Sequence, residues 1–335
     1  MMGRRLWSRL LLQAVFVLLA VGTLCFVMAE ALPGDAAYRV AAGRYGYDVM
    51  NAEIAEAVRA ELGLDRPAVV RWGDWLVQLA QGDLGRSVVL GDTVVSLLAV
   101  QLGHTVWLSL VAWAMALVLG LSLGFWTALR PHGWVRHAVD QLNTVLRASP
   151  SFLLGVVLST LLAVELGWFP VAGHEDADHV ILPALTLALT LCPGFTQVVR
   201  GAALKLLHSD AFEFAQVKGV PVSAALWRHA LPQTLLATLA YAGVQLVLLI
   251  EGMVVVETLF AWPGIGHALV HAVIARDVPM IQGTAISMAL LFVLLSGAID
   301  LLLHWLDPRL ADVQTAQRMP AEAPSRTAPA AESES

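Results

Sequence analysis

The sequence predicts an all-α integral membrane protein with six transmembrane helices and a long outer loop after the first of them. Its 335 residues are 58% hydrophobic and only 14% charged, which is more apolar than the surface of a water-soluble domain of this size tolerates. The apolar residues are gathered in six runs, and a long polar segment separates the first run from the rest. An even number of spans places both ends of the chain on one side of the membrane.

The first apolar run extends from Leu10 to Met28 and follows an N-terminal segment that carries three arginines. At about 1.5 Å per residue it crosses roughly 28 Å of hydrocarbon. Ala29-Glu30-Ala31 resembles the cleavage site of a signal peptide, but the run is longer than the roughly 7 to 15 apolar residues of such a peptide. We therefore expect residues 1–31 to form a cytoplasmic N-terminus and a retained first span.

Residues 32–104 form a polar segment, which we expect on the outer, periplasmic side because the first span begins inside. Acidic side chains are frequent in it, and Ala52 to Leu62 has the pattern of a short amphipathic helix that ends at Gly63. Trp72 and Trp75 are expected at the membrane interface, where indole rings favour the lipid headgroups.

Five further apolar runs complete the predicted set: 105–129, 145–166, 181–199, 233–256 and 284–306. The connections that six spans place inside carry most of the remaining lysines and arginines, whereas the outer connection 167–180 has none. Both termini are therefore expected in the cytoplasm. Residues 105–310 form the predicted membrane core, and residues 311–335, rich in Ala, Pro, Ser and Glu, form a tail that we expect to be disordered.

A polar stretch at residues 210–232 separates the fourth and fifth apolar runs. Asp210 and Glu213 have the spacing of a capping box that opens a short helix, and Gly219 is expected as its left-handed C-terminal stop. A second short helix is expected from Ser223 to Pro232. The stretch thus predicts two short helices outside the bilayer, with an ordinary interhelical loop as the alternative.

Six positions of this stretch share one spacing pattern: Glu213, Ala215, Gly219, His229, Leu231 and Pro232. The pattern resembles the EAA loop of ABC-importer permeases, although Phe214 replaces an alanine and His229 stands where isoleucine is frequent. In that family the loop docks into a groove of a separate ATPase subunit. The resemblance implies that residues 210–232 are a coupling loop.

Eight more short segments extend the pattern: Ala31–Asp35, Glu61–Pro67, Gly82–Ser87, Leu182–Leu185, Val255–Thr258, Phe260–Gly266, Arg276-Asp277 and Leu306–Arg309. In this order they resemble the permeases of dipeptide, oligopeptide and nickel importers. The resemblance covers residues 6–310 and implies the type I ABC importer permease fold in a bacterial inner membrane. It also implies three kinds of partner, namely a second homologous permease, two ABC ATPase subunits and an extracytoplasmic solute-binding protein.

The sequence lacks the nucleotide-binding motif of an ATPase. No G-x-x-x-x-G-K-S/T segment occurs, because the only lysines, Lys205 and Lys218, are followed by Leu and Gly. The chain is therefore predicted to have no ATPase site and no cofactor, with ATP and Mg in the partner ATPase subunits. A net charge of -6 without a basic face argues against nucleic acid as a partner. Cys25 and Cys192 lie within apolar runs and are expected to be packing residues.

Glu251 and Asp300 are the ionisable residues that lie deepest in the predicted spans. Glu251 precedes Gly252 where the resembled permeases commonly have two glycines. A carboxylate facing the pathway there would favour a cationic group of the substrate, and a paired or protonated packing residue is the alternative. Asp300 matches an acidic position of the family, which implies a structural hydrogen-bonding role.

The outer mouth of the pathway is expected near Glu257 and the tight turn formed by Trp262, Pro263 and Gly264. Phe260 and Trp262 are expected to anchor this turn at the membrane interface. A plain re-entry turn is the alternative for each of these residues.

Two pairs of histidines suggest a possible metal site. His267 and His271 lie four residues apart, which is one helical face, and His174 and His179 flank an acidic loop. Solvated surface histidines are the alternative, and they are the commoner case for such pairs.

These observations predict the permease subunit of a binding-protein-dependent ABC importer that takes up dipeptides or oligopeptides. Nickel or metal-chelate uptake by the same mechanism is the first alternative. A stand-alone ion-coupled carrier is the second, and a membrane-bound enzyme is disfavoured because no catalytic constellation of residues is apparent.

Overall fold

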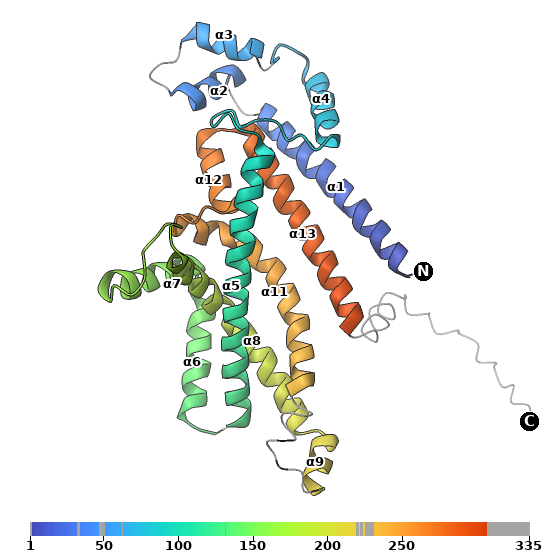
Figure 1. The fold of residues 1–335 in the computed structure, drawn as a ribbon, viewed down its shortest axis with the longest axis vertical. Helices are drawn as coiled ribbons and strands as arrows, with labels where there is room; N and C mark the ends of the chain where they lie inside the picture. Colours follow the sequence, from blue (N-terminus) through green and yellow to red (C-terminus); the bar gives the residue numbers. More distant parts are fainter. Residues whose placement is uncertain are drawn as a thin grey trace, which may run out of the picture.

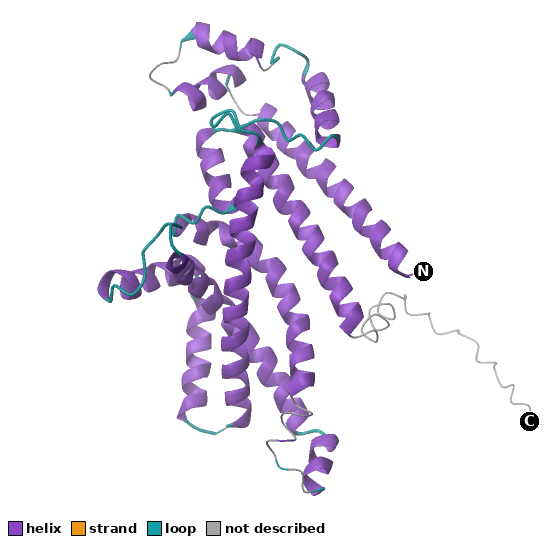
Figure 2. Ribbon diagram, viewed as in Figure 1, coloured by secondary structure: helices purple, strands orange, loops and turns teal. Residues whose placement is uncertain are grey.

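The computed structural model describes residues 2–31, 34–46, 51–61, 63–130, 132–218, 221, 224 and 231–306, and this part of the chain consists mainly of helices joined by loops (Figures 1 and 2). An isolated bridge between Arg86 and Thr93 is its sole β-type pairing. Four single helices are long and apolar enough to cross a membrane, and two bent helix pairs raise the number to six if each pair is one span. The predicted all-α membrane fold is confirmed.

Four helices form the N-terminal part: α1 (Met2–Ala31), α2 (Ala36–Tyr45), α3 (Ala52–Glu61) and α4 (Ala68–Ala80). The helix α1 lies beside α13 (Val278–Leu306), and α2 to α4 gather at one end of the molecule (Figure 1). The expected short helix at Ala52 is confirmed as α3. Trp72 and Trp75 of α4 both contact α1: the Trp72 indole N–H donates to Thr23 at 3.3 Å, and the Trp75 ring lies against Gly22.

The central pair of helices is α5 (Val94–Leu129) and α8 (Ile181–Leu207). Small residues recur every fourth position on the buried face of α5: Ala112, Ala116, Gly120, Gly124 and Ala128. This stripe lets the two backbones approach closely, because a side chain at Gly120 would collide with Phe195 and one at Gly124 would meet Val199 at 2.6 Å. With 36 residues α5 is about 54 Å long, so it extends beyond the hydrocarbon and begins within the expected outer segment 32–104.

The span expected at 145–166 is not one continuous helix. Its residues belong to two arms, α6 (Trp134–Ala148) and then α7 (Ser151–Leu158) with the π-helix η2 (Ser159–Glu165), which meet at 112°. Pro150 lies at the junction; it lacks an N–H donor, and the residue before it, Ser149, is extended with ψ 125°. The apolar run therefore turns a corner instead of crossing straight.

The C-terminal half continues with α9 (Asp210–Val217), α11 (Leu231–Leu259), α12 (Ile265–Ala275) and α13, after the 3-10 turn η3 (Ala177–Val180). The helix α11 is also bent, by 67° between Ala237–Val247 and Gly252–Leu259. A short apolar helix, α12, occupies the connection expected to follow the fifth span. The helix α9 projects at the end of the molecule opposite α2 to α4 (Figure 1).

Candidate functional site

Glu257 is the centre of a buried polar cluster where α5, α11 and α12 meet. Its side chain is 0% exposed, and its Oε1 accepts a 2.6 Å hydrogen bond from the Thr105 hydroxyl of α5. Its Oε2 accepts from the backbone N–H groups of Gly266 at 2.7 Å and His267 at 3.2 Å. Thr105 in turn accepts from the N–H of Ile265 at 2.8 Å. The cluster therefore joins α5, α11 and the first turn of α12.

This arrangement supplies α12 with the N-terminal cap that its own sequence lacks. The residue before the helix, Gly264, has no side chain and makes no capping bond. The Glu257 carboxylate instead binds the unpaired N–H groups of the first turn, where the helix dipole also favours negative charge. A side chain at Gly264 would collide with the Glu257 carboxylate, and one at Gly266 would meet the Val254 Cα at 2.6 Å. The two glycines therefore permit the close approach.

The expectation that Phe260 and Trp262 anchor the turn at the membrane interface is wrong. Both are buried, at 1% and 5% exposure, and they belong to the main hydrophobic core. The Trp262 indole N–H donates to the backbone carbonyl of His104 at 3.1 Å, which ties the turn to α5. The sharp turn itself is present: Ala261 has φ 48° and the Gly264 N–H donates to the Trp262 carbonyl at 2.7 Å.

Asp277 is a second buried carboxylate, at the turn between α12 and α13. It is 3% exposed, and its oxygens accept from the Ser87 hydroxyl, from Val88 N at 3.3 Å and from Val89 N at 3.4 Å. It also accepts from Met280 N at 3.2 Å in the first turn of α13. Asp277 thus fastens the loop that precedes α5 to the end of α12, so a carboxyl group holds α12 at each end.

The histidines do not form a metal cluster in the described part of the chain, where no three His, Cys, Asp or Glu side chains converge. The rings of His267 and His271 are in contact, with centroids 4.4 Å apart. Burial lowers the pKa of His267, and the neighbouring His271 lowers it further, so the imidazole is neutral at pH 7. His174 lies against His104, whereas His179 binds back to Asp176 in its own turn.

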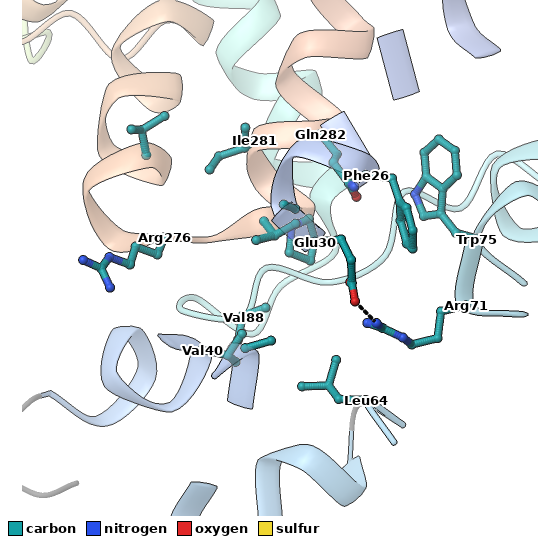
Figure 3. Close-up of a pocket in the computed structure, with 15 residues that line it drawn as sticks. Phe26, Glu30, Val40, Leu64, Arg71, Trp75, Val88, Arg276, Ile281 and Gln282 are labelled. Carbon is teal, nitrogen blue, oxygen red and sulfur yellow. Dashed lines mark hydrogen bonds and ion pairs between the residues drawn. The ribbon is translucent and has the colours of Figure 1, made fainter. Parts of the chain in front are cut away.

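A cavity of about 500 Å³ lies between the C-terminal end of α1 and the N-terminal turns of α4 and α13 (Figure 3). Its walls are mostly apolar and include Phe26 and Trp75. The main polar contact in it is an ion pair between the Arg71 guanidinium and the Glu30 carboxylate, 2.6 Å apart, which fastens α4 to the end of α1 (Figure 3). The sequence gives no sign of this cavity because its walls come from segments that are distant in the chain.

At the opposite end, α9 presents an exposed apolar face. Phe214 is 60% exposed and Val217 is 80% exposed, while Phe212 on the other face is buried. The Lys218 ammonium lies over the Phe214 ring, 4.5 Å from its centroid. Two large apolar side chains beside Glu213 and Lys218 on a projecting helix form a surface suited to docking another protein.

The prediction that Asp210 caps this helix is wrong. Ser209, and not Asp210, is the cap, because its hydroxyl accepts from Phe212 N at 3.4 Å and its carbonyl from Glu213 N at 3.1 Å. Asp210 and Glu213 lie inside the first turn, where negative charges interact favourably with the helix dipole.

Several predicted site residues lie wholly or partly outside the described residues. Gly219 and His229, the expected second helix from Ser223 and the tail at 311–335 are outside them. The backbones of Ala215, Pro232, Glu251 and Asp300 lie in described helices, but their side chains are not described. Leu231 is the first residue of α11, so this helix includes the predicted apolar run 233–256 and two residues before it. The pathway role expected for Glu251 stays a prediction.

The arrangement of these helices defines a class of membrane protein. The chain is similar to a chain of the MetNI methionine ABC transporter in an inward-facing conformation, with a TM-score of 0.54 and 18% identity, over 63% of this chain and 96% of that one. It is also similar to an amino acid ABC transporter solved with histidines, with a TM-score of 0.50 and 15% identity, over 63% and 94% of the chains. The fold is that of a type I ABC importer permease.

Two family models match most of the chain. Residues 120–312 match the binding-protein-dependent transport system inner membrane component, and residues 2–108 match the N-terminal model of such membrane components. The chain belongs to this family of permeases, which are multi-pass proteins of the inner membrane.

The relatives of known name agree with this assignment. A Brucella abortus protein named as a permease of a peptide transport system is 37% identical over 89% of this chain and 96% of its own length. GsiC, the glutathione transport system permease protein, is 34% identical in Pectobacterium atrosepticum and 32% identical in Escherichia coli, in each case over 90% of this chain and 96% of the relative.

Proposed function

We propose that this chain is the permease subunit of an ABC importer that moves short peptides into the cell. The family, the fold and the names of the relatives, which refer to peptide and glutathione transport, support this proposal. The nickel alternative is not favoured, since neither these relatives nor the described histidines point to a metal.

The observation that carries the proposal is the exposed apolar face of α9. A helix that ends a span and leaves Phe214 and Val217 open to water needs a protein partner to cover them. Because this helix lies where the resembled permeases have their coupling loop, the partner is an ABC ATPase subunit. Two such subunits hold ATP and Mg, and this chain has no ATPase site of its own.

The remaining assembly follows from the same proposal. A second, homologous permease lies beside this chain, and an extracytoplasmic solute-binding protein delivers the peptide to the end formed by α2 to α4 and α12. The helix α9 and both termini are then cytoplasmic. ATP binding closes the ATPase pair, α9 transmits the motion, and the spans reorient around the pathway.

The test is co-purification of the tagged chain from its native membrane, with the bound proteins identified by mass spectrometry. Phe214→Ser with Val217→Ser should release the ATPase subunits, whereas Val69→Ser, at an equally exposed apolar position of α4 at the other end, should retain them. Recovery of the chain alone, still able to transport peptide after reconstitution, would instead indicate a stand-alone carrier.

A further inference from the structure

Arg147 is an arginine that the fold places against the middle of a membrane helix. It is the last residue but one of α6, just before the corner between α6 and α7. Its Nη2 donates to the side-chain carbonyl of Gln197 at 2.6 Å and to the backbone carbonyl of Pro193 at 3.3 Å, both on α8. Pro193 lies near the middle of the 27 residues of α8, roughly 20 Å from either end. The guanidinium is therefore near the mid-depth of this span.

The charge of this guanidinium is not neutralised within the described part of the chain. None of the ion pairs there includes Arg147, and its two acceptors are neutral carbonyl groups. Both bonds come from Nη2, so the N–H groups of Nε and Nη1 are open to an anion. Charged residues this deep in a bilayer are costly, and they face a bundle interior or a water-filled cavity. Because Arg147 is exposed on this chain, its anion comes from outside the chain.

The face of α8 that carries Gln197 is polar and open along the span. Four small or polar residues recur on it at helical spacing and are all exposed: Thr190, Gln197, Gly201 and Lys205. Nothing lies within 4 Å of a side chain placed at Gly201. A surface that faces lipid is apolar, as on α1, where the exposed large side chains are Leu, Val, Phe and Met. This face of α8 therefore borders water or another protein.

A water-filled pathway fits this face better than a dry contact with the second permease. In a dry interface the charge of Arg147 would carry its full desolvation cost without compensation from this chain. In a pathway it stays hydrated until an anion binds. A short linear peptide carries a carboxylate at its C-terminus, and a guanidinium binds a carboxylate through two parallel hydrogen bonds.

We propose that Arg147, positioned by Gln197 and the Pro193 carbonyl, binds the C-terminal carboxylate of the transported peptide as it passes this span. Linear peptides with a free C-terminus share this group whatever their side chains. The contact therefore favours such peptides over amidated ones without selecting their sequence. The inference rests on the proposed peptide transport.

The experiment compares two cargoes in the complete importer, reconstituted in proteoliposomes with its solute-binding protein. The cargoes are trialanine and trialanine amide, which differ in the charge at the C-terminus. The measured quantity is the ratio of their uptake rates, and any preference of the binding protein cancels when a variant is compared with the wild type. The variants are Arg147→Gln, which removes the charge, and Arg147→Lys, which keeps it. Arg130→Gln, at an exposed arginine at the end of α5, is the control.

Arg147→Gln should lower the ratio of trialanine to trialanine amide uptake about tenfold, as the loss of a charged hydrogen-bonding partner predicts. Arg147→Lys should keep most of the wild-type ratio, because its ammonium group still attracts the carboxylate, and Arg130→Gln should keep all of it. If the wild type does not take up trialanine amide, trialanine alone is compared, and Arg147→Gln should be about tenfold slower than Arg147→Lys.

Equal ratios, or equal trialanine rates, in Arg147→Gln and Arg147→Lys would overturn the inference. Loss of the second permease when the Arg147→Gln protein is purified with its partners would also overturn it, because the charge would then serve a contact between subunits.

The two proposals fail in different ways. A wild-type importer that takes up neither cargo overturns peptide transport, and the role of Arg147 with it. A wild-type importer that takes up trialanine, with Arg147 variants that do not differ from one another, overturns the role of Arg147 alone.

Discussion

The Glu257 carboxylate and the Thr105 hydroxyl form a 2.6 Å hydrogen bond between residues that are 152 positions apart in the sequence. This bond links α5 to α11, and the same carboxylate caps α12 through Gly266 and His267. This end of the permease is therefore organised around a buried carboxyl group, and the position of that group depends on partners from three helices.

Replacing Glu257 tests how much this cluster contributes to stability. Glu257→Ala leaves two backbone N–H groups and the Thr105 hydroxyl buried without an acceptor, at about 1–3 kcal/mol for each unpaired group. We expect a loss of several kcal/mol in the free energy of unfolding, and a smaller loss for Glu257→Gln, which keeps one acceptor. Thermal unfolding in detergent measures both. Glu165→Ala, at an exposed position, serves as the control, and equal losses at Glu257 and Glu165 would contradict the assignment.

A substitution at Gly264, which lies against the Glu257 carboxylate, is a second test of this cluster. The Cβ introduced by Gly264→Ala would occupy the space of the Glu257 carboxylate, which cannot move away without losing its bonds to α12. We expect a lowered unfolding temperature and reduced transport. Gly252→Ala is the matched control, because nothing lies within 4 Å of its new Cβ and alanine favours the helix by about 1 kcal/mol. If Gly264→Ala is as stable as Gly252→Ala, the close contact between Gly264 and the Glu257 carboxylate does not contribute to stability.

The pairing of α5 with α8 makes a third prediction. Gly120→Ala should destabilise the protein by about 1–3 kcal/mol, because the new methyl group meets the backbone and Cβ of Phe195. Gly103→Ala lies on the same helix with open space around it and should be neutral or slightly stabilising. Denaturation of the two variants in the same detergent compares them directly. A stable Gly120→Ala protein would show that the helices can separate at little cost.

The membrane class and the positions of the long apolar helices could be predicted from the sequence because the bilayer requires long apolar runs, whereas the bends that divide two of the six predicted runs were not predicted. The bend after Ser149 has a signal in the sequence, since Pro150 disfavours helix at the preceding residue, but the prediction of a span at 145–166 did not take this proline into account. The projection at α9 was evident from its polar residues, although the cap moved by one position to Ser209.

The polar clusters could not be predicted in this way. Thr105, Gly266 and Glu257 lie on different elements, and no periodicity in the sequence brings a particular pair together. The same holds for Arg147 and Gln197, whose contact depends on how α6 packs against α8. Trp262 was misplaced because an aromatic residue near the end of a span can face either the lipid headgroups or the core, and only the neighbouring helices decide which.

Asp277 provides the last prediction, which concerns the loop before α5. Ser87, Val88 and Val89 are held by this carboxylate, while the preceding Arg86 is exposed to proteases. Asp277→Ala removes the acceptor, so the loop should open more often, and trypsin should cleave after Arg86 about tenfold faster for each 1.4 kcal/mol lost. Limited proteolysis in detergent, followed by mass spectrometry of the fragments, measures this rate. Asp92→Ala removes an exposed carboxylate of the same loop and should leave the rate unchanged. Faster cleavage in both variants, or in neither, would show that Asp277 does not hold the loop in place.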